Sequence, residues 1–146
     1  MTATTTRPAT AGDVTVQRLT ITLCGSLGRA AHDLARVHWH LHAAGHEVYA
    51  PVPAPPEADP SPTQIENIVA KHMQRIDRSD LVIAVIPDGV IGHRTGDEMR
   101  RAERQGISTR YDTDVDALIA DITAGRLLDG TDTCPRDAVT AVPVAR

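Results

Sequence analysis

Apolar residues in the middle of the chain form short runs with turn residues between them. Residues 19–26 (LTITLCGS) are rich in β-branched side chains and end in a Gly-Ser pair, which predicts a strand near 19–24 followed by a loop. Similar runs predict strands near 46–51, 81–86 and 107–111. The run LVIAVIP at 81–87 is unbroken, as expected of a central parallel strand covered on both faces.

Between these runs, the apolar residues follow helical spacing. Residues 29–44 predict a helix that Gly45 ends. The segment Ser61-Pro62-Thr63-Gln64 is typical of a capping box with proline in the first helical position. Two further helices are expected around 97–105 and 115–128. The side chains expected to face the core are Leu34, Val37, Leu41 and Ala44; Ile65, Ile68, Val69, Met73 and Ile76; and Leu118, Ile119, Ile122 and Leu127.

The alternation of strands and helices predicts an α/β fold, a Rossmann-like three-layer sandwich with a parallel sheet of four to five strands. Residues 17–128 would form the domain, 1–16 a flexible arm, and 129–146 a loose tail rich in Asp, Thr, Pro and Gly. Ligands of such sheets bind outside the carboxyl ends of the strands. This rule directs attention to two loops, 24–29 and 88–98.

Composition narrows the classes of partner. The 146 residues carry a net charge of −4 and only one Trp, two Tyr and no Phe, which argues against binding to a nucleic acid polymer. No apolar run approaches the ~20 residues of a membrane helix, so no membrane partner is expected. The two cysteines form no spaced cluster, and the N-terminus lacks the apolar stretch of a secretion signal. We therefore expect a cytoplasmic protein.

The first loop could hold an anion. Glycines at a strand-to-helix turn let backbone amides face a ligand, and the following helix adds a partial positive charge. The sequence matches neither the dinucleotide-binding pattern nor a P-loop, and an ordinary βα turn is the alternative. The candidate binding residues of this loop are Cys24, Gly25, Ser26, Leu27, Gly28 and Arg29.

The second loop contains a carboxylate that could act on a sugar. Glu98 follows Gly92, Thr95 and Gly96, and it is expected in the first turn of a helix beneath the end of the central strand. A carboxylate in this position could attack an anomeric carbon. The alternative is that it only complements the helix dipole. Arg100, Arg101 and Arg104, which follow on the same helix, are expected to form a solvated face.

Four histidines are close together in the sequence, but their pattern does not favour a metal site. His38 and His42 lie four residues apart, yet Trp39 stands where a zincin would carry a glutamate. No cysteine or acid falls at ligand spacing near them or near His40 and His46. We expect no metal and no redox cofactor.

The segments LTITLCGSLG, AAGHEVYAP, IDRSDLVIAVIPDGVIG and TGDEMRRAERQGI together resemble the nucleoside 2-deoxyribosyltransferase-like superfamily, which includes 2′-deoxynucleoside 5′-phosphate N-hydrolases. The resemblance covers about two thirds of the chain, from Leu19 to Tyr111. It implies a flavodoxin-like fold, assembly into homodimers or larger homo-oligomers, and cleavage of an N-glycosidic bond through a glutamate. The acceptor of the sugar would be water or a second base.

The resemblance also implies roles for single residues. The family's glutamate nucleophile falls on Glu98, and its Cys-Gly-Ser turn, which helps to hold a 5′-phosphate in the hydrolases, falls on 24–26. Asp80 falls on an aspartate that we interpret as structural. The position of an aspartate that assists at the base is occupied by His72, whose imidazole could protonate a departing base.

The sequence thus predicts cleavage or transfer at the N-glycosidic bond of a nucleoside or nucleoside 5′-monophosphate. Glu98 would be the nucleophile and His72 the acid/base. Two alternatives stay open at this stage. One is a non-catalytic nucleotide-sensing domain that uses the same cleft, and the other is a structural or partner-binding domain.

Overall fold

The computed structural model describes residues 17–130 and 140–141. Four parallel strands form the main sheet in the order β2-β1-β3-β5. Their bounds are Thr20–Cys24 (β1), Glu47–Tyr49 (β2), Leu81–Val85 (β3) and Ser108–Asp112 (β5). The predicted α/β fold with a parallel sheet, a flavodoxin- or Rossmann-like sandwich, is therefore confirmed. The arm expected at 1–16 lies outside the described residues.

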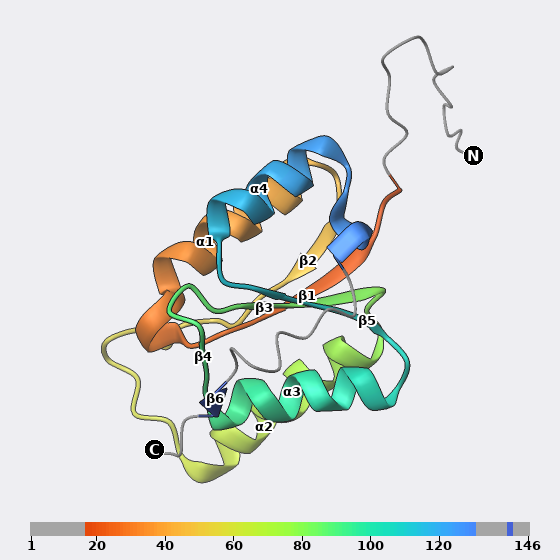
Figure 1. Cartoon of the computed structure of the whole chain (residues 1–146). Helices are drawn as coiled ribbons and strands as arrows, with labels where there is room; N and C mark the ends of the chain where they lie inside the picture. The colour runs from red at the N-terminus through yellow and green to blue at the C-terminus, as the bar shows by residue number, and fades with distance from the viewer. Residues whose placement is uncertain (1–16, 131–139, 142–146) are drawn as a thin grey trace, which may run out of the picture.

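Two helices cover each face of the sheet (Figure 1). Helices α1 (Leu27–Ala43) and α4 (Val115–Ala124) pack on one face, and α2 (Pro62–Asp77) and α3 (His93–Arg104) on the other. The sheet side chains alternate between these layers, as the pleat requires. Leu23, Ile83 and Val85 face α1 and α4, whereas Cys24 and Ala84 face α2 and α3.

Helix α1 follows its sequence signals closely. Ser26 caps its N-terminus by accepting a hydrogen bond from the backbone N–H of Arg29. Gly45 takes a positive φ of 98°, which ends the helix as predicted. The expected core positions Leu34, Val37 and Leu41 are buried. Ala44, expected to face the core, is exposed because it is the C-cap residue.

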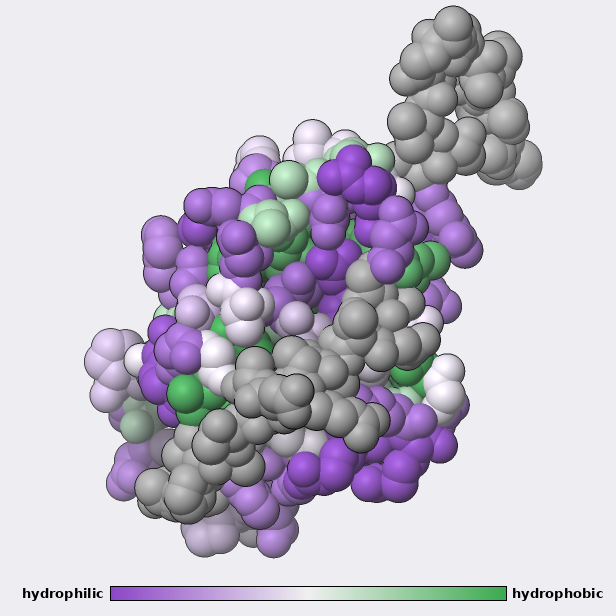
Figure 2. Space-filling model, in the orientation of Figure 1, coloured by the Kyte–Doolittle hydropathy of each residue, from purple (hydrophilic) through white to green (hydrophobic). Residues whose placement is uncertain are grey.

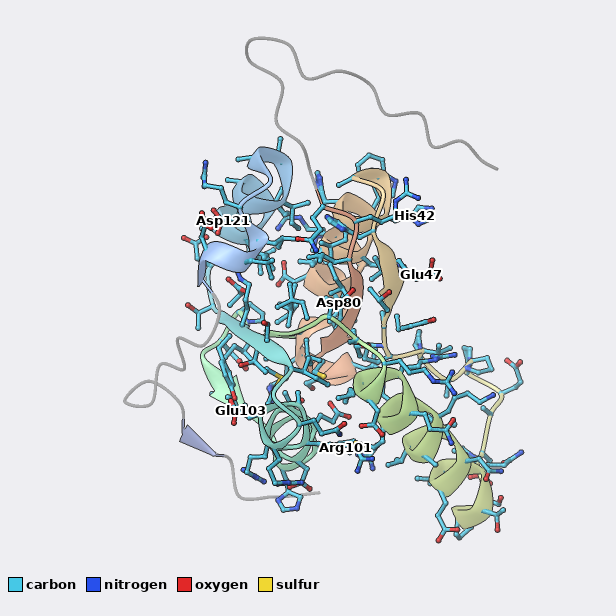
Figure 3. The ribbon with its side chains drawn as sticks, turned by 90° about the vertical axis from the view of Figure 1, so that its right-hand side faces the viewer. His42, Glu47, Asp80, Arg101, Glu103 and Asp121 are labelled. Atoms are coloured by element: carbon cyan, nitrogen blue, oxygen red, sulfur yellow. The ribbon has the colours of Figure 1, made fainter. Side chains whose placement is uncertain are left out.

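Helix α2 begins at the predicted capping box, in which the side-chain oxygens of Ser61 and Gln64 each accept a hydrogen bond from the other residue's backbone N–H. The prediction that its apolar side chains are buried is wrong in the N-terminal half of the helix. Ile76 is buried, but Ile65 is exposed and Ile68 is 58% exposed. A 16-residue helix is about 24 Å long, whereas a five-residue strand spans about 17 Å. The helix consequently runs past the sheet, as Figure 3 shows.

The other boundary differences lie near the C-terminus. Gly125, in the left-handed conformation, ends α4 before residue 128, and a 3₁₀ turn (η1, Leu127–Gly130) follows. Within the tail expected at 129–146, Thr140–Ala141 (β6) pairs in parallel with Val90–Ile91 (β4), a short strand in the segment predicted as a loop. None of the helices within the described residues is both long and apolar enough to cross a bilayer.

Asp77 joins the two helices of the α2–α3 layer. Arg101 reaches from α3 toward α2 (Figure 3) and binds the Asp77 carboxylate through Nε and Nη2, at 2.7 and 2.8 Å. Gln105 donates a third hydrogen bond to the same group. The Arg101 side chain thus links two helices and does not belong to the solvated face that the sequence predicted. The remaining charges on the outer side of α3 contribute to the hydrophilic surface at the bottom of Figure 2.

This contact predicts a specific acid sensitivity. Hydrogen bonds from Arg101 and Gln105 lower the pKa of Asp77 from 3.8 to about 2. Because the folded-state pKa is depressed, its stabilisation is present above pH ~4 and is lost as the pH falls toward about 2. In urea unfolding at about pH 5 and about pH 3, Asp77→Asn should lose less stability between the two pH values than the parent. Asp59→Asn, at an exposed loop position, is the control; equal pH dependence in all three proteins would contradict the prediction.

Candidate functional site

Two neighbouring strands of the sheet, β1 and β3, end at the point where the strand order reverses. The chain passes from β1 to β2 on one side and then to β3 on the other. A crevice between strand ends forms at such a point, and ligands bind there in open α/β sheets. Both loops selected from the sequence, 24–29 and 88–98, lie at this edge because they follow these two strands.

Cys24, His72 and Glu98 meet beside the end of β1. They come from β1, α2 and α3 respectively, and one ligand-type atom from each lies within 4.8 Å of the other two. His72 Nε2 is 3.5 Å from Glu98 Oε2 and 3.7 Å from Cys24 Sγ. The His72 and Glu98 side chains are 11% and 8% exposed, and Cys24 is fully buried. Glu98 and His72, the two predicted catalytic residues, are therefore neighbours.

Glu98 reaches this position from the second turn of its helix. Helix α3 begins at His93, four residues before the predicted start, so the expectation that Glu98 stands in the first turn is wrong. The cause is that Gly92 is the N-cap and Thr95 and Gly96 are helical, although their residue types favour a loop. The dipole effect is strongest in the first turn. The Glu98 carboxylate instead faces the imidazole of His72.

The environment sets the protonation of the Cys24 thiol. Burial, together with the charge and hydrogen bonding of the Glu98 carboxylate, raises the pKa of Cys24 well above its usual value. The thiol therefore stays protonated at neutral pH and is not a nucleophile. Its S–H group can donate a hydrogen bond to the side chain of Glu98 or His72.

The predicted anion loop folds as a tight turn. Gly25 is required there, because a Cβ atom at this residue would lie 2.8 Å from the carbonyl oxygen of Val85. Ser26 is half-buried and caps α1, whose first turn contains no acidic residue. Leu27 and Gly28 occupy the exposed first turn of the helix. The backbone N–H groups of this turn can face an anion, as proposed from the sequence.

Arg29 has a partner that the sequence interpretation missed. Its Nε donates a hydrogen bond of 2.9 Å to Oδ2 of Asp88, and Oδ1 of Asp88 accepts from the backbone N–H of Val90. The Pro-Asp-Gly turn after β3 was the signal for a carboxylate at this edge. An arriving anion would compete with Asp88 for the guanidinium of Arg29.

A shallow hollow with room for about one water-sized group lies between the two loops. It is lined by four polar residues and five apolar ones: Ser26, Arg29, Asp88 and Thr95, and Ala30, Val85, Ile86, Pro87 and Val90. Glu98 does not line this hollow, so the prediction that Ser26 and Glu98 share one cleft is not confirmed. Thr95 lines it, and Glu98 lies three residues further along the same helix. Gly92 and Gly96 flank Thr95, with Gly96 packed against Ile91 and the Arg100 side chain.

Two further residues of the sequence analysis have structural roles. Asp80 accepts a hydrogen bond of 2.8 Å from the backbone N–H of Thr20 at the start of β1, in agreement with its interpretation as structural. His46 is buried, and its Nδ1 accepts from the backbone N–H of Leu19 at 3.1 Å. Burial and the charge of Arg18 lower the pKa of His46, which favours the neutral ring that this bond needs.

No family model, curated protein or solved structure matches this chain.

Proposed function

We propose that this protein cleaves the N-glycosidic bond of a nucleoside or nucleoside 5′-monophosphate, with Glu98 as the nucleophile. The observation that carries the proposal is the 3.5 Å approach of His72 Nε2 to Glu98 Oε2 at the ligand-binding edge of the sheet. A carboxylate and an imidazole in contact, both largely shielded from water, supply a nucleophile and a proton carrier at one point. The resemblance of the surrounding motifs to the nucleoside 2-deoxyribosyltransferase-like superfamily supports the same assignment.

In the first step, a Glu98 oxygen attacks the anomeric carbon of the sugar. The bond from that carbon to the base nitrogen breaks, and the base leaves with the bonding pair and a proton from the protonated His72. The sugar is left as an ester of Glu98. In the second step, water attacks the anomeric carbon while His72 takes its proton, and Glu98 is released. A second base in place of water would complete a transfer.

The surroundings favour a substrate with an apolar ring and an anionic end. Ile65 and Ile68 stand seven and four residues before His72, on the same side of α2, and both are exposed. They form an apolar strip leading away from His72 against which the face of a base can lie. The backbone N–H groups of the exposed first turn at Leu27 and Gly28, together with the hydroxyl of Ser26, can supply donors for a phosphate on the other side, while the N–H of Arg29 is used by the Ser26 cap.

A panel of nucleosides and their 5′-monophosphates, analysed by chromatography for free base, tests this proposal. We expect release of base from at least one substrate, with tighter binding of the monophosphate than of the matching nucleoside. The preference should shrink in Ser26→Ala, because one hydrogen bond to a charged group contributes about 1.5–3 kcal/mol. Ser61→Ala, which removes the cap of α2 instead, is the matched control. Absence of base release across the panel would refute the enzymatic proposal.

A further inference from the structure

The three polar atoms beside the end of β1 all lie within 4.8 Å of one another. His72 Nε2 is 3.7 Å from Cys24 Sγ and 3.5 Å from Glu98 Oε2. The contact between nitrogen and oxygen is longer than the 2.7–3.2 Å of a well-formed N–H···O bond. One ring nitrogen also carries at most one hydrogen, so it cannot donate to both neighbours. The Cys24 thiol is within hydrogen-bonding reach of both other groups, whereas the contact between His72 and Glu98 is too long for a strong hydrogen bond.

Two of the three separations match edges of a tetrahedron around a metal ion, and the third pair of atoms lies within 4.8 Å. Zinc lies about 2.3 Å from a thiolate sulfur, about 2.0–2.1 Å from an imidazole nitrogen and about 2.0–2.2 Å from a carboxylate oxygen. Tetrahedral angles then separate sulfur from nitrogen by about 3.6 Å and nitrogen from oxygen by about 3.4 Å. The corresponding separations here are 3.7 and 3.5 Å.

We propose that Cys24, His72 and Glu98 bind a zinc-class transition-metal ion through Sγ, Nε2 and a carboxylate oxygen. Thiolate and imidazole ligands select zinc or cobalt over magnesium and calcium, which prefer oxygen ligands alone. The ion replaces the thiol proton of Cys24, which passes to solvent. The thiolate and the Glu98 carboxylate then balance the two positive charges. Three protein ligands leave a fourth position for water.

The fold prepares this site before any ion arrives. Cys24 is fixed by the β1–β3 pairing, in which it stands opposite Ala84. Glu98 is anchored by its buried neighbour Met99 in α3. His72 stands one turn before the buried Ile76 of α2. Rigid elements that hold ligands in place lower the ordering cost of binding. The proposal departs from the expectation of no metal, which rested on the spacing of histidines, cysteines and acids along the sequence.

Binding of the ion has a consequence for the proposed reaction, and this consequence alone rests on the proposed function. A carboxylate oxygen bound to metal is not free to attack an anomeric carbon, and a metal-bound Nε2 cannot carry a proton to the base. The ion and the nucleoside therefore exclude each other, so that zinc acts as a reversible inhibitor of base release.

Titration of the full-length, reduced and metal-free protein with Co²⁺ tests the site directly. We expect one equivalent to produce a near-ultraviolet thiolate-to-cobalt band and the intense visible bands of a tetrahedral ion, and Zn²⁺ to abolish both. Cys24→Ala should lose the near-ultraviolet band and bind Co²⁺ at least about 100-fold more weakly, since even the loss of residues that only hydrogen-bond to metal ligands weakens binding about 10–100-fold. Cys134→Ser, which removes the other cysteine, and His38→Ala, within the α1 histidines, should keep the parental spectrum.

Several outcomes would overturn the proposal: no thiolate band in the parent, or a band that survives Cys24→Ala and is lost in Cys134→Ser. If circular dichroism shows that Cys24→Ala does not fold, His72→Gln serves instead. It keeps the thiol and should still lose most of the cobalt affinity, and parental affinity in folded His72→Gln would refute the site. The spectra do not depend on turnover. Cobalt binding without base release would therefore refute only the proposed function, and base release without cobalt binding only the metal site.

Discussion

Replacing Glu98 with glutamine is expected to lower the rate of base release by at least about 1000-fold. Removal of a covalent nucleophile typically has an effect of this size or larger. Glutamine keeps the shape and hydrogen-bonding reach of the side chain, but its amide does not form the sugar ester. Substrate affinity should therefore change by less than about tenfold, or ~1.4 kcal/mol. Both quantities follow from single-turnover base release and from equilibrium binding of the same nucleotide.

The matched control is Glu66→Gln, which makes the same chemical change at an exposed position of α2. It should leave both quantities near the parental values. A nucleoside with a 2-fluoro sugar, which slows the second step, should add the mass of one sugar to the parent and to Glu66→Gln. The adduct should be absent from Glu98→Gln. An adduct on another residue would show that Glu98 is not the nucleophile.

A nucleotide sensor built on the same residues would give a different pattern. The parent would bind nucleotide saturably without releasing base, and Glu98→Gln would change binding alone. The close contacts of Glu98 with His72 and Cys24 would then serve to shape the site. Turnover by the parent therefore decides between the two functions before any variant is made.

Local sequence signals predicted the elements of the sheet well. β-Branched runs located the strands, the Ser61 capping box placed the start of α2, and Gly45 placed the end of α1. These signals depend on backbone conformation and burial within a few residues. The start of α3 was missed because Thr95 and Gly96 have poor helix propensity, although both are buried residues of the helix.

Properties that depend on how elements meet could not be derived from periodicity. The apolar pattern of α2 continues to Ile65, but the sequence of the helix does not indicate how far the sheet extends beneath it. The Cys24–His72–Glu98 cluster joins three elements, and its first two members are 48 positions apart in the sequence. The strand-end rule brought Cys24 and Glu98 to one edge, and the family resemblance singled out His72. Only the packing of α2 and α3 on the sheet sets the distances within this cluster.

Arg110 on β5 is the centre of a buried ion network that the strand pattern did not predict. Its side chain is 6% exposed. The guanidinium donates two bonds to Asp112, at 3.0 and 2.9 Å, and one of 2.9 Å to Asp121 of α4. A fourth bond of 2.8 Å reaches the carbonyl oxygen of Leu127 in η1. One cation therefore ties the edge strand to the helix and the 3₁₀ turn that follow it.

Arg110→Met should lower the free energy of unfolding by about 3–5 kcal/mol, because it leaves two carboxylates without their shared cation. This is a large part of the 5–15 kcal/mol typical of a domain. The control is Arg126→Met: Arg126 is 55% exposed and contacts Asp121 at 3.3 Å, so its loss should cost less than about 1 kcal/mol. Urea unfolding of the three proteins, with unchanged dependence on denaturant, measures both differences. The prediction would be contradicted if Arg110→Met were no less stable than Arg126→Met. In that case, solvent or rearranged side chains would satisfy Asp112 and Asp121, and the network would not stabilise the packing of α4 on the sheet.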